Sequence, residues 1–98
     1  MSRRTDYEIV GADRHWNRVI VASPPGILEE VTFGQEPDAE FLVYEPTISQ
    51  LVPMPMDDAL GYLSGAAPAL DKPPDLGTFA NTKSCLAFIR ERRMALAN

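Results

Sequence analysis

Short apolar runs separated by turn residues fill the first half of the chain. Residues 7–10 and 19–22 are rich in β-branched and aromatic side chains, which favour strands over helices. Residues 11–18 between them are long for a hairpin loop but short enough to keep the two strands antiparallel neighbours. Trp16 is a candidate to extend the second strand, where it would share a face with Ile20.

Two more strands are predicted before residue 46. Residues 27–33 show a partial alternation of apolar and polar positions, and residues 40–44 form a compact apolar run after a glutamate. Residues 34–38 contain Gly, Pro and Asp, which suit the turn of a hairpin. The prolines after Ser23 and the Glu45–Pro46 pair end the preceding strands. This half of the chain therefore predicts a four-stranded antiparallel meander.

The second half changes to helical patterns. Residues 47–52 fit a fifth short strand or an irregular crossing. Residues 56–63 predict a short helix, because Pro55 suits a first turn, two aspartates follow it, and apolar residues recur at helical spacing. Gly65 would end this helix. Residues 66–77 carry three prolines and predict an extended connector.

The longest helix is predicted at residues 83–97, which contain neither proline nor glycine. Thr78 or Asn81 would cap its N-terminus. An apolar stripe with Phe88 at its edge is expected to face inward, and its members are Cys85, Leu86, Ile89 and Leu96.

These elements predict an α+β fold: a four- or five-stranded antiparallel sheet with the C-terminal helix packed on one face and a short second helix. The short helix and the proline-rich connector are expected to edge the sheet. We expect one domain over residues 1–98, because two halves of a chain this short would be too small to fold alone. Its parts are a β-meander (1–46), a short helix with a proline-rich arm (47–77) and the C-terminal helix (78–98).

Composition limits the setting in which this domain works. The chain has 98 residues, of which 45% are hydrophobic, yet no apolar run approaches the roughly 18 residues of a membrane span. The N-terminus lacks the apolar region of a secretory signal. With one cysteine the chain forms no internal disulfide. We therefore expect a soluble, cytoplasmic protein that does not bind membranes.

Charge is divided unevenly along the chain. The formal net charge is −5, and no lysine or arginine occurs from Val19 to Asp71, a stretch with nine acidic residues. The two flanking segments carry all nine basic residues. An asymmetry of this kind bears on partners and on electrostatic steering.

The chain lacks the sets of residues that most catalytic and ligand-binding sites require. Cys85 and His15 are each unique, but a cysteine on an apolar stripe is usually a small hydrophobic residue. No second histidine completes a metal site, and no glycine-rich phosphate motif occurs. We therefore predict a protein that is not an enzyme, with no cofactor and no metal.

Direct nucleic-acid binding is also not favoured. The arginines near Tyr7 and Trp16, together with those at residues 90–93, could contact phosphates. The isoelectric point of about 4.7 and the acidic middle of the chain argue against this function.

The acidic middle predicts instead a surface for a basic protein partner. Acidic residues on neighbouring strands and their turn would gather on one face, which could occupy a groove that another protein keeps for DNA or RNA. Such a nucleic-acid mimic would suit an inhibitor or accessory factor of viral or mobile-element type. Trp16, either a core anchor or an interface residue, completes the predicted partner-binding set with Glu29, Glu30, Glu36, Asp38, Glu40 and Glu45.

Two other classes of function remain open at this level. A structural protein could self-associate through an open sheet edge. A small ligand-binding domain or enzyme could use Asp13, His15 and Trp16, provided that these residues meet at the mouth of a pocket.

Overall fold

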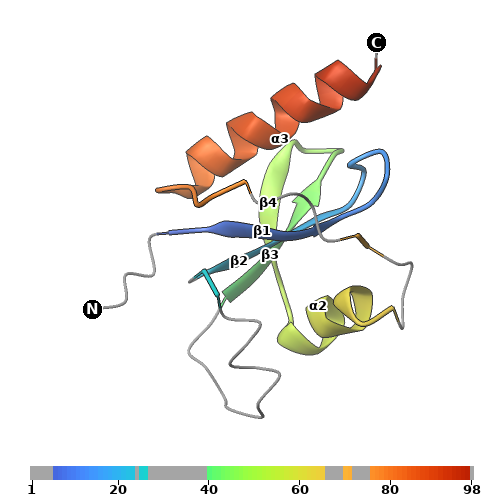
Figure 1. Cartoon of the computed structure of the whole chain (residues 1–98), viewed down its shortest axis with the longest axis vertical. Helices are drawn as coiled ribbons and strands as arrows, with labels where there is room; N and C mark the ends of the chain where they lie inside the picture. Colours follow the sequence, from blue (N-terminus) through green and yellow to red (C-terminus); the bar gives the residue numbers. More distant parts are fainter. Residues whose placement is uncertain (1–5, 24, 27–39, 66–69, 72–75, 98) are drawn as a thin grey trace.

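A computed structural model describes residues 6–23, 25–26, 40–65, 70–71 and 76–97. These residues form one antiparallel sheet in the order β1-β2-β3-β4 and two helices, which confirms the α+β fold (Figure 1). The predicted strand at 27–33 and the turn at 34–38 lie outside the described residues, and residues 50–54 supply the fourth strand. The elements are β1 (Glu8–Ala12), β2 (Val19–Ser23), β3 (Glu40–Glu45), β4 (Gln50–Met54), α2 (Met56–Leu63) and α3 (Thr82–Ala97).

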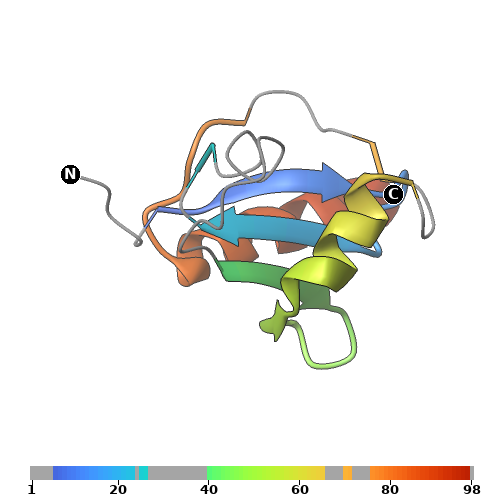
Figure 2. The same cartoon turned by 90° about the horizontal axis from the view of Figure 1, so that it is seen from below.

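The sheet is covered on both faces. Side chains alternate along a strand, so β2 sends Val19 and Val21 toward α3 and Ile20 and Ala22 toward α2. All four are 0% exposed. Figures 1 and 2 show α3 and α2 on opposite sides of the strands. The prediction that the short helix edges the sheet is therefore wrong, because the apolar residues on the second face of β2 and β3 require a cover of their own.

Gly11 lies at a β-bulge in β1 and faces α2. The pairing of β1 with β2 shifts register between Ile9 and Gly11, so that Val10 and Gly11 both face α2. A Cβ atom at Gly11 would lie 2.7 Å from Cδ2 of Leu63 in α2. The missing side chain allows the C-terminal turn of α2 to approach β1 closely.

The two edges of the sheet differ. Residues beyond α2 return along β1, where Ala12 and Asp71 exchange two backbone hydrogen bonds of 3.1 Å and Tyr7 and Phe79 two of 2.8 Å. The described part of the predicted proline-rich arm thus edges the sheet, as expected. No strand of the described residues pairs with the outer edge of β4. Pro53 lies in this strand and has no N–H to donate to a further strand.

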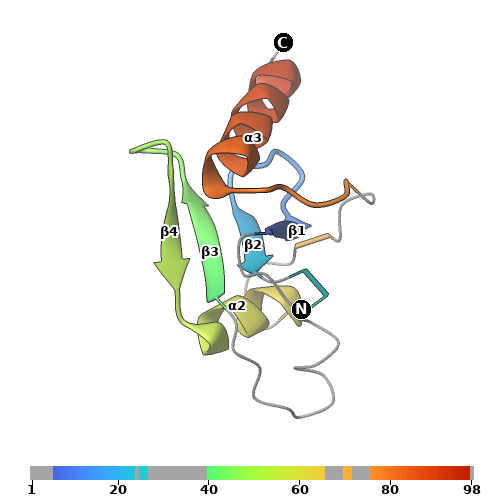
Figure 3. The same ribbon diagram turned by 90° about the vertical axis from the view of Figure 1, so that its left-hand side faces the viewer.

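Helix α3 begins as predicted, and its predicted inward stripe packs in the core except for Leu96. The Ser84 N–H donates to Oδ1 of Asn81 at 2.8 Å, which identifies Asn81 rather than Thr78 as the cap. Cys85 and Ile89 are 0% exposed, whereas Leu96 is 46% exposed and does not belong to the inward stripe. Sixteen helical residues span about 24 Å, more than the roughly 17 Å of a five-residue strand, and the C-terminal end extends past the sheet (Figure 3).

Candidate functional site

The β1–β2 loop turns Trp16 into the core. The Trp16 N–H donates to the Asp13 carbonyl at 3.0 Å, and Asp13 and Arg18 close the loop through a backbone bond of 3.1 Å. Trp16 has φ of 57°, a left-handed conformation outside any strand, so its predicted place in the second strand is wrong. Only 7% of the residue is exposed. Of the two predicted environments for Trp16, the structure has the core one; its role in partner binding stays a prediction.

Two arginines of α3 pack on the aromatic side chains around this loop. The Arg92 guanidinium lies 5.5 Å from the centre of the Trp16 ring, and that of Arg93 lies 5.2 Å from the centre of the Tyr44 ring. Phe88 meets the Trp16 ring edge-on at 6.0 Å. We call these five residues the arginine–aromatic cluster. Cation–π contacts of this kind are each worth about 0.5–2 kcal/mol.

Arg93 also links α3 to the β1–β2 loop. Its Nη1 donates to the carbonyl oxygen of Trp16 and, at 3.0 Å, to Oδ1 of Asn17. Beside these bonds lies a cavity of about 220 Å³, lined by His15, Asn17, Arg93, Leu96 and Ala97. Sequence reasoning treated the arginines of the loop and of α3 as separate groups. No local pattern indicated that Arg93 of α3 would reach the loop.

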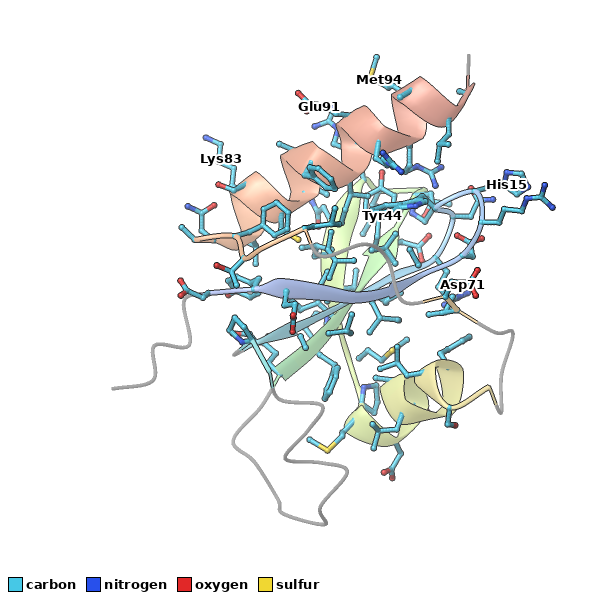
Figure 4. All side chains as sticks on the ribbon, in the orientation of Figure 1. His15, Tyr44, Asp71, Lys83, Glu91 and Met94 are labelled. Carbon is cyan, nitrogen blue, oxygen red and sulfur yellow. The ribbon has the colours of Figure 1, made fainter. Side chains whose placement is uncertain are left out.

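Asp13, His15 and Trp16 do not converge on a pocket. The Asp13 carboxylate accepts the Arg18 N–H at 3.0 Å and so serves the loop itself. His15 is exposed near the tip of the loop (Figure 4), whereas the adjacent Trp16 is buried. Of the three, only His15 lines the 220 Å³ cavity. The geometry offers these residues no common substrate position.

The predicted acidic residues are only partly described, and the described ones lie apart. Glu29, Glu30, Glu36 and Asp38 fall outside the described residues. Glu40 and Glu45 stand at opposite ends of β3, and their odd spacing puts them on opposite faces of the sheet. Glu45 accepts the Thr47 hydroxyl at 2.8 Å, so it holds the β3–β4 turn.

A different acidic group appears at one end of the sheet. Glu8 opposes Ala22 on β2, and Glu40 opposes the next residue, Ser23. The exposed Asp57 and Asp58 begin α2, directly after the end of β4 that pairs with the start of β3. Residues 27–39 join Gly26 to Glu40 at this same end. We call it the acidic end, and its described members are Asp6, Glu8, Glu40, Asp57 and Asp58.

A second cavity lies between β4 and the first turns of α3. It has about 340 Å³ and is lined by Gln50, Leu51, Thr82, Lys83 and Leu86. The Lys83 side chain is directed away from the sheet (Figure 4). Leu51 and Leu86 give the cavity an apolar part, and Lys83 is the one titratable side chain among its described lining residues.

Cys85 is a core residue by its surroundings. It is 0% exposed, and burial raises the pKa of its thiol from the ordinary value of 9.0 to about 12. A thiol with a pKa this high stays protonated at neutral pH and is therefore a poor nucleophile. No group of three or more His, Cys, Asp or Glu residues within the described part of the chain could hold a metal ion.

We expect Cys85 to resist alkylation at pH 8–9 while the protein is folded. Thiolate is the reacting species, so a pKa of about 12 in place of 9.0 should slow the reaction with iodoacetamide by at least about 100-fold relative to the urea-unfolded chain. The raised pKa also makes stability depend on pH. Between pH 9 and pH 12 the thiol ionises in the unfolded state but stays protonated in the folded state, so the free energy of unfolding falls as pH rises. Mass spectrometry of timed samples measures the rate; equal rates in the two states would contradict the burial.

No protein-family model matches the chain, and the searches of curated proteins and of solved structures give no match either. Among the described helices, none combines the length and apolar character needed to cross a membrane.

Proposed function

We propose that this chain is a non-enzymatic interaction module whose acidic end docks on the basic surface of a protein that handles nucleic acid. The observation that carries the proposal is that five described acidic residues, distributed over both faces, belong to the end of the sheet to which residues 27–39 are joined. Those residues add four more acidic side chains. A concentration of negative charge steers a positively charged partner and favours fast, salt-sensitive association.

The arginines lie away from the acidic end, and this position supports the proposal. The β1–β2 loop and the C-terminal turns of α3, which carry the arginine–aromatic cluster, lie at the opposite end of the sheet (Figure 1). Lys83 is the described basic residue on the first turn of α3, and the described arginines lie on the β1–β2 loop and on later turns of α3. A basic partner therefore meets little repulsion at the acidic end. An inhibitor or accessory factor that occupies a nucleic-acid groove would work in this way.

The test compares two double variants of equal charge change. Glu30→Lys with Glu40→Lys reverses charge at the acidic end or on the segment tethered to it. Asp71→Lys with Glu91→Lys is the matched control, because both residues are exposed and lie away from that end (Figure 4). Tagged proteins are incubated with nuclease-treated lysate and washed at about 0.1 M and about 1 M salt, where the Debye length is about 10 and 3 Å.

We expect the unmodified chain and the control to retain the same basic nucleic-acid-binding protein at low salt only. The acidic-end variant should retain at least about tenfold less of it, and the purified partner should lose nucleic acid when the chain is added. Equal retention by both variants, or retention that salt does not change, would overturn the proposal. Recovery of the chain alone as concentration-dependent oligomers would favour self-assembly through the open edge of β4.

A further inference from the structure

A second binding site lies at the opposite end of the molecule from the acidic end. The cavity of about 220 Å³ between the β1–β2 loop and the last turns of α3 is lined by hydrogen-bond donors on one side and by Leu96 and Ala97 on the other. Its hydrogen-bond donors come from two segments that lie more than 70 residues apart in the sequence. We propose that this cavity binds the phosphate group of a phosphate monoester.

Arg93 provides the charge for this site. Its Nη1 makes both of its hydrogen bonds, to Trp16 and Asn17, so the Nε and Nη2 groups keep their donors. Among the described residues, no carboxylate lies within ion-pair distance of its guanidinium. The two bonds and the stacking on Tyr44 hold the guanidinium in one orientation. A half-buried, oriented arginine without a counter-charge favours an anion.

The number of donors favours phosphate over carboxylate. Asn17 uses its Oδ1 to accept from Arg93, which leaves its amide NH₂ as a donor. His15 contributes a ring nitrogen from the rim of the cavity. These donors approach from different side chains and match an anion with three acceptor oxygens, whereas a carboxylate offers two oxygens in one plane. Arg14 and Arg92, both exposed, add positive potential on the neighbouring loop and helix, which opposes the partial negative charge at the C-terminal end of α3.

The apolar side of the cavity indicates an organic substituent on the phosphate. Leu96 is 46% exposed and lines the cavity together with Ala97. A carbon group on the fourth phosphate oxygen could rest on Leu96 and Ala97 and remove apolar area from water. We therefore expect a phosphate monoester to bind more tightly than free inorganic phosphate.

Titrations with inorganic phosphate and with phenyl phosphate test the site and separate the two sources of phosphate. Trp16 is the only tryptophan, so its fluorescence reports events at the Arg92 and Arg93 contacts. ¹H–¹⁵N NMR spectra at constant ionic strength, kept with sodium chloride, identify the residues affected. We expect saturable shifts at His15, Asn17 and the Nε–H of Arg93, with phenyl phosphate binding several-fold tighter.

Four single variants decide the outcome. His15→Ala and Arg93→Lys should each weaken binding by about tenfold, because a hydrogen bond to a charged group is lost or displaced. Leu96→Ala should remove the advantage of phenyl phosphate only. Lys83→Ala, which removes one positive charge at the other end of α3, should leave binding unchanged.

His15 is exposed and outside the core, so its variant keeps the fold even if Arg93→Lys loosens the loop. Shifts with phosphate no larger than those with sodium chloride would overturn the inference, as would an equal effect of Lys83→Ala and His15→Ala. The site is independent of the acidic end, so the Glu30→Lys and Glu40→Lys variant should bind phenyl phosphate at least as tightly as the unmodified chain.

Discussion

Replacing Trp16 with alanine is expected to lower the free energy of unfolding by about 3–5 kcal/mol. The residue is 7% exposed, meets Phe88 edge-on, carries the Arg92 guanidinium on its ring, and belongs to the cluster beneath α3. Its removal leaves a cavity and deprives two other side chains of their packing surface. Domains of this size are stable by only about 5–15 kcal/mol, so the loss takes a large share of the total.

Urea unfolding followed by far-UV circular dichroism measures this loss, because the variant has no tryptophan for fluorescence. Trp16→Phe is the matched control: it keeps an aromatic ring against Phe88 and should retain more than half of the lost stability. A loss below about 1 kcal/mol for Trp16→Ala would contradict its place in the core.

The second large effect distinguishes two apolar residues of α3. Ile89→Ala should lower the free energy of unfolding by about 2–5 kcal/mol, because Ile89 is 0% exposed in the core between α3 and the sheet. Leu96→Ala should change it by no more than about 0.5 kcal/mol, because Leu96 lies 46% exposed beyond the strands. Both substitutions shorten an aliphatic side chain on the same helix. Helix propensity therefore contributes little to the difference between them.

Thermal and urea unfolding of the two variants against the unmodified chain give both values. Similar losses for Ile89→Ala and Leu96→Ala would mean that the whole predicted apolar stripe faces the sheet. That outcome would also weaken the phosphate proposal, which uses Leu96 as an accessible wall of the cavity.

The two proposals assign different tasks to the two ends of one sheet. β2 runs between them, buried on both faces, and keeps the acidic end and the arginine–aromatic cluster at fixed separation. An acidic end that meets a basic protein and a basic pocket that holds a phosphate could act on the same partner complex. The variants above change one end at a time and so separate the two functions.

Local sequence signals determined the elements of this protein. The β-branched runs predicted β1 and β2, because such residues fit a pleated surface without help from distant parts of the chain. The Pro55, Asp57 and Asp58 signals predicted α2 with its observed bounds, and Asn81 was one of two candidate caps for α3. Turns, caps and periodic apolar spacing act over a few residues, which is why one sequence suffices to read them.

Only the tertiary structure decided where those elements meet. The strand pattern of β3 put Glu40 and Glu45 in one acidic set, but their positions at opposite ends of β3 separate them. Leu96 has the spacing of a core residue, yet the sheet ends before it. Arg93 reaches Trp16 across 77 residues, and the left-handed turn at Trp16 directs the indole toward α3. Such contacts depend on the relative lengths and orientation of packed elements, and no local pattern of residues encodes them.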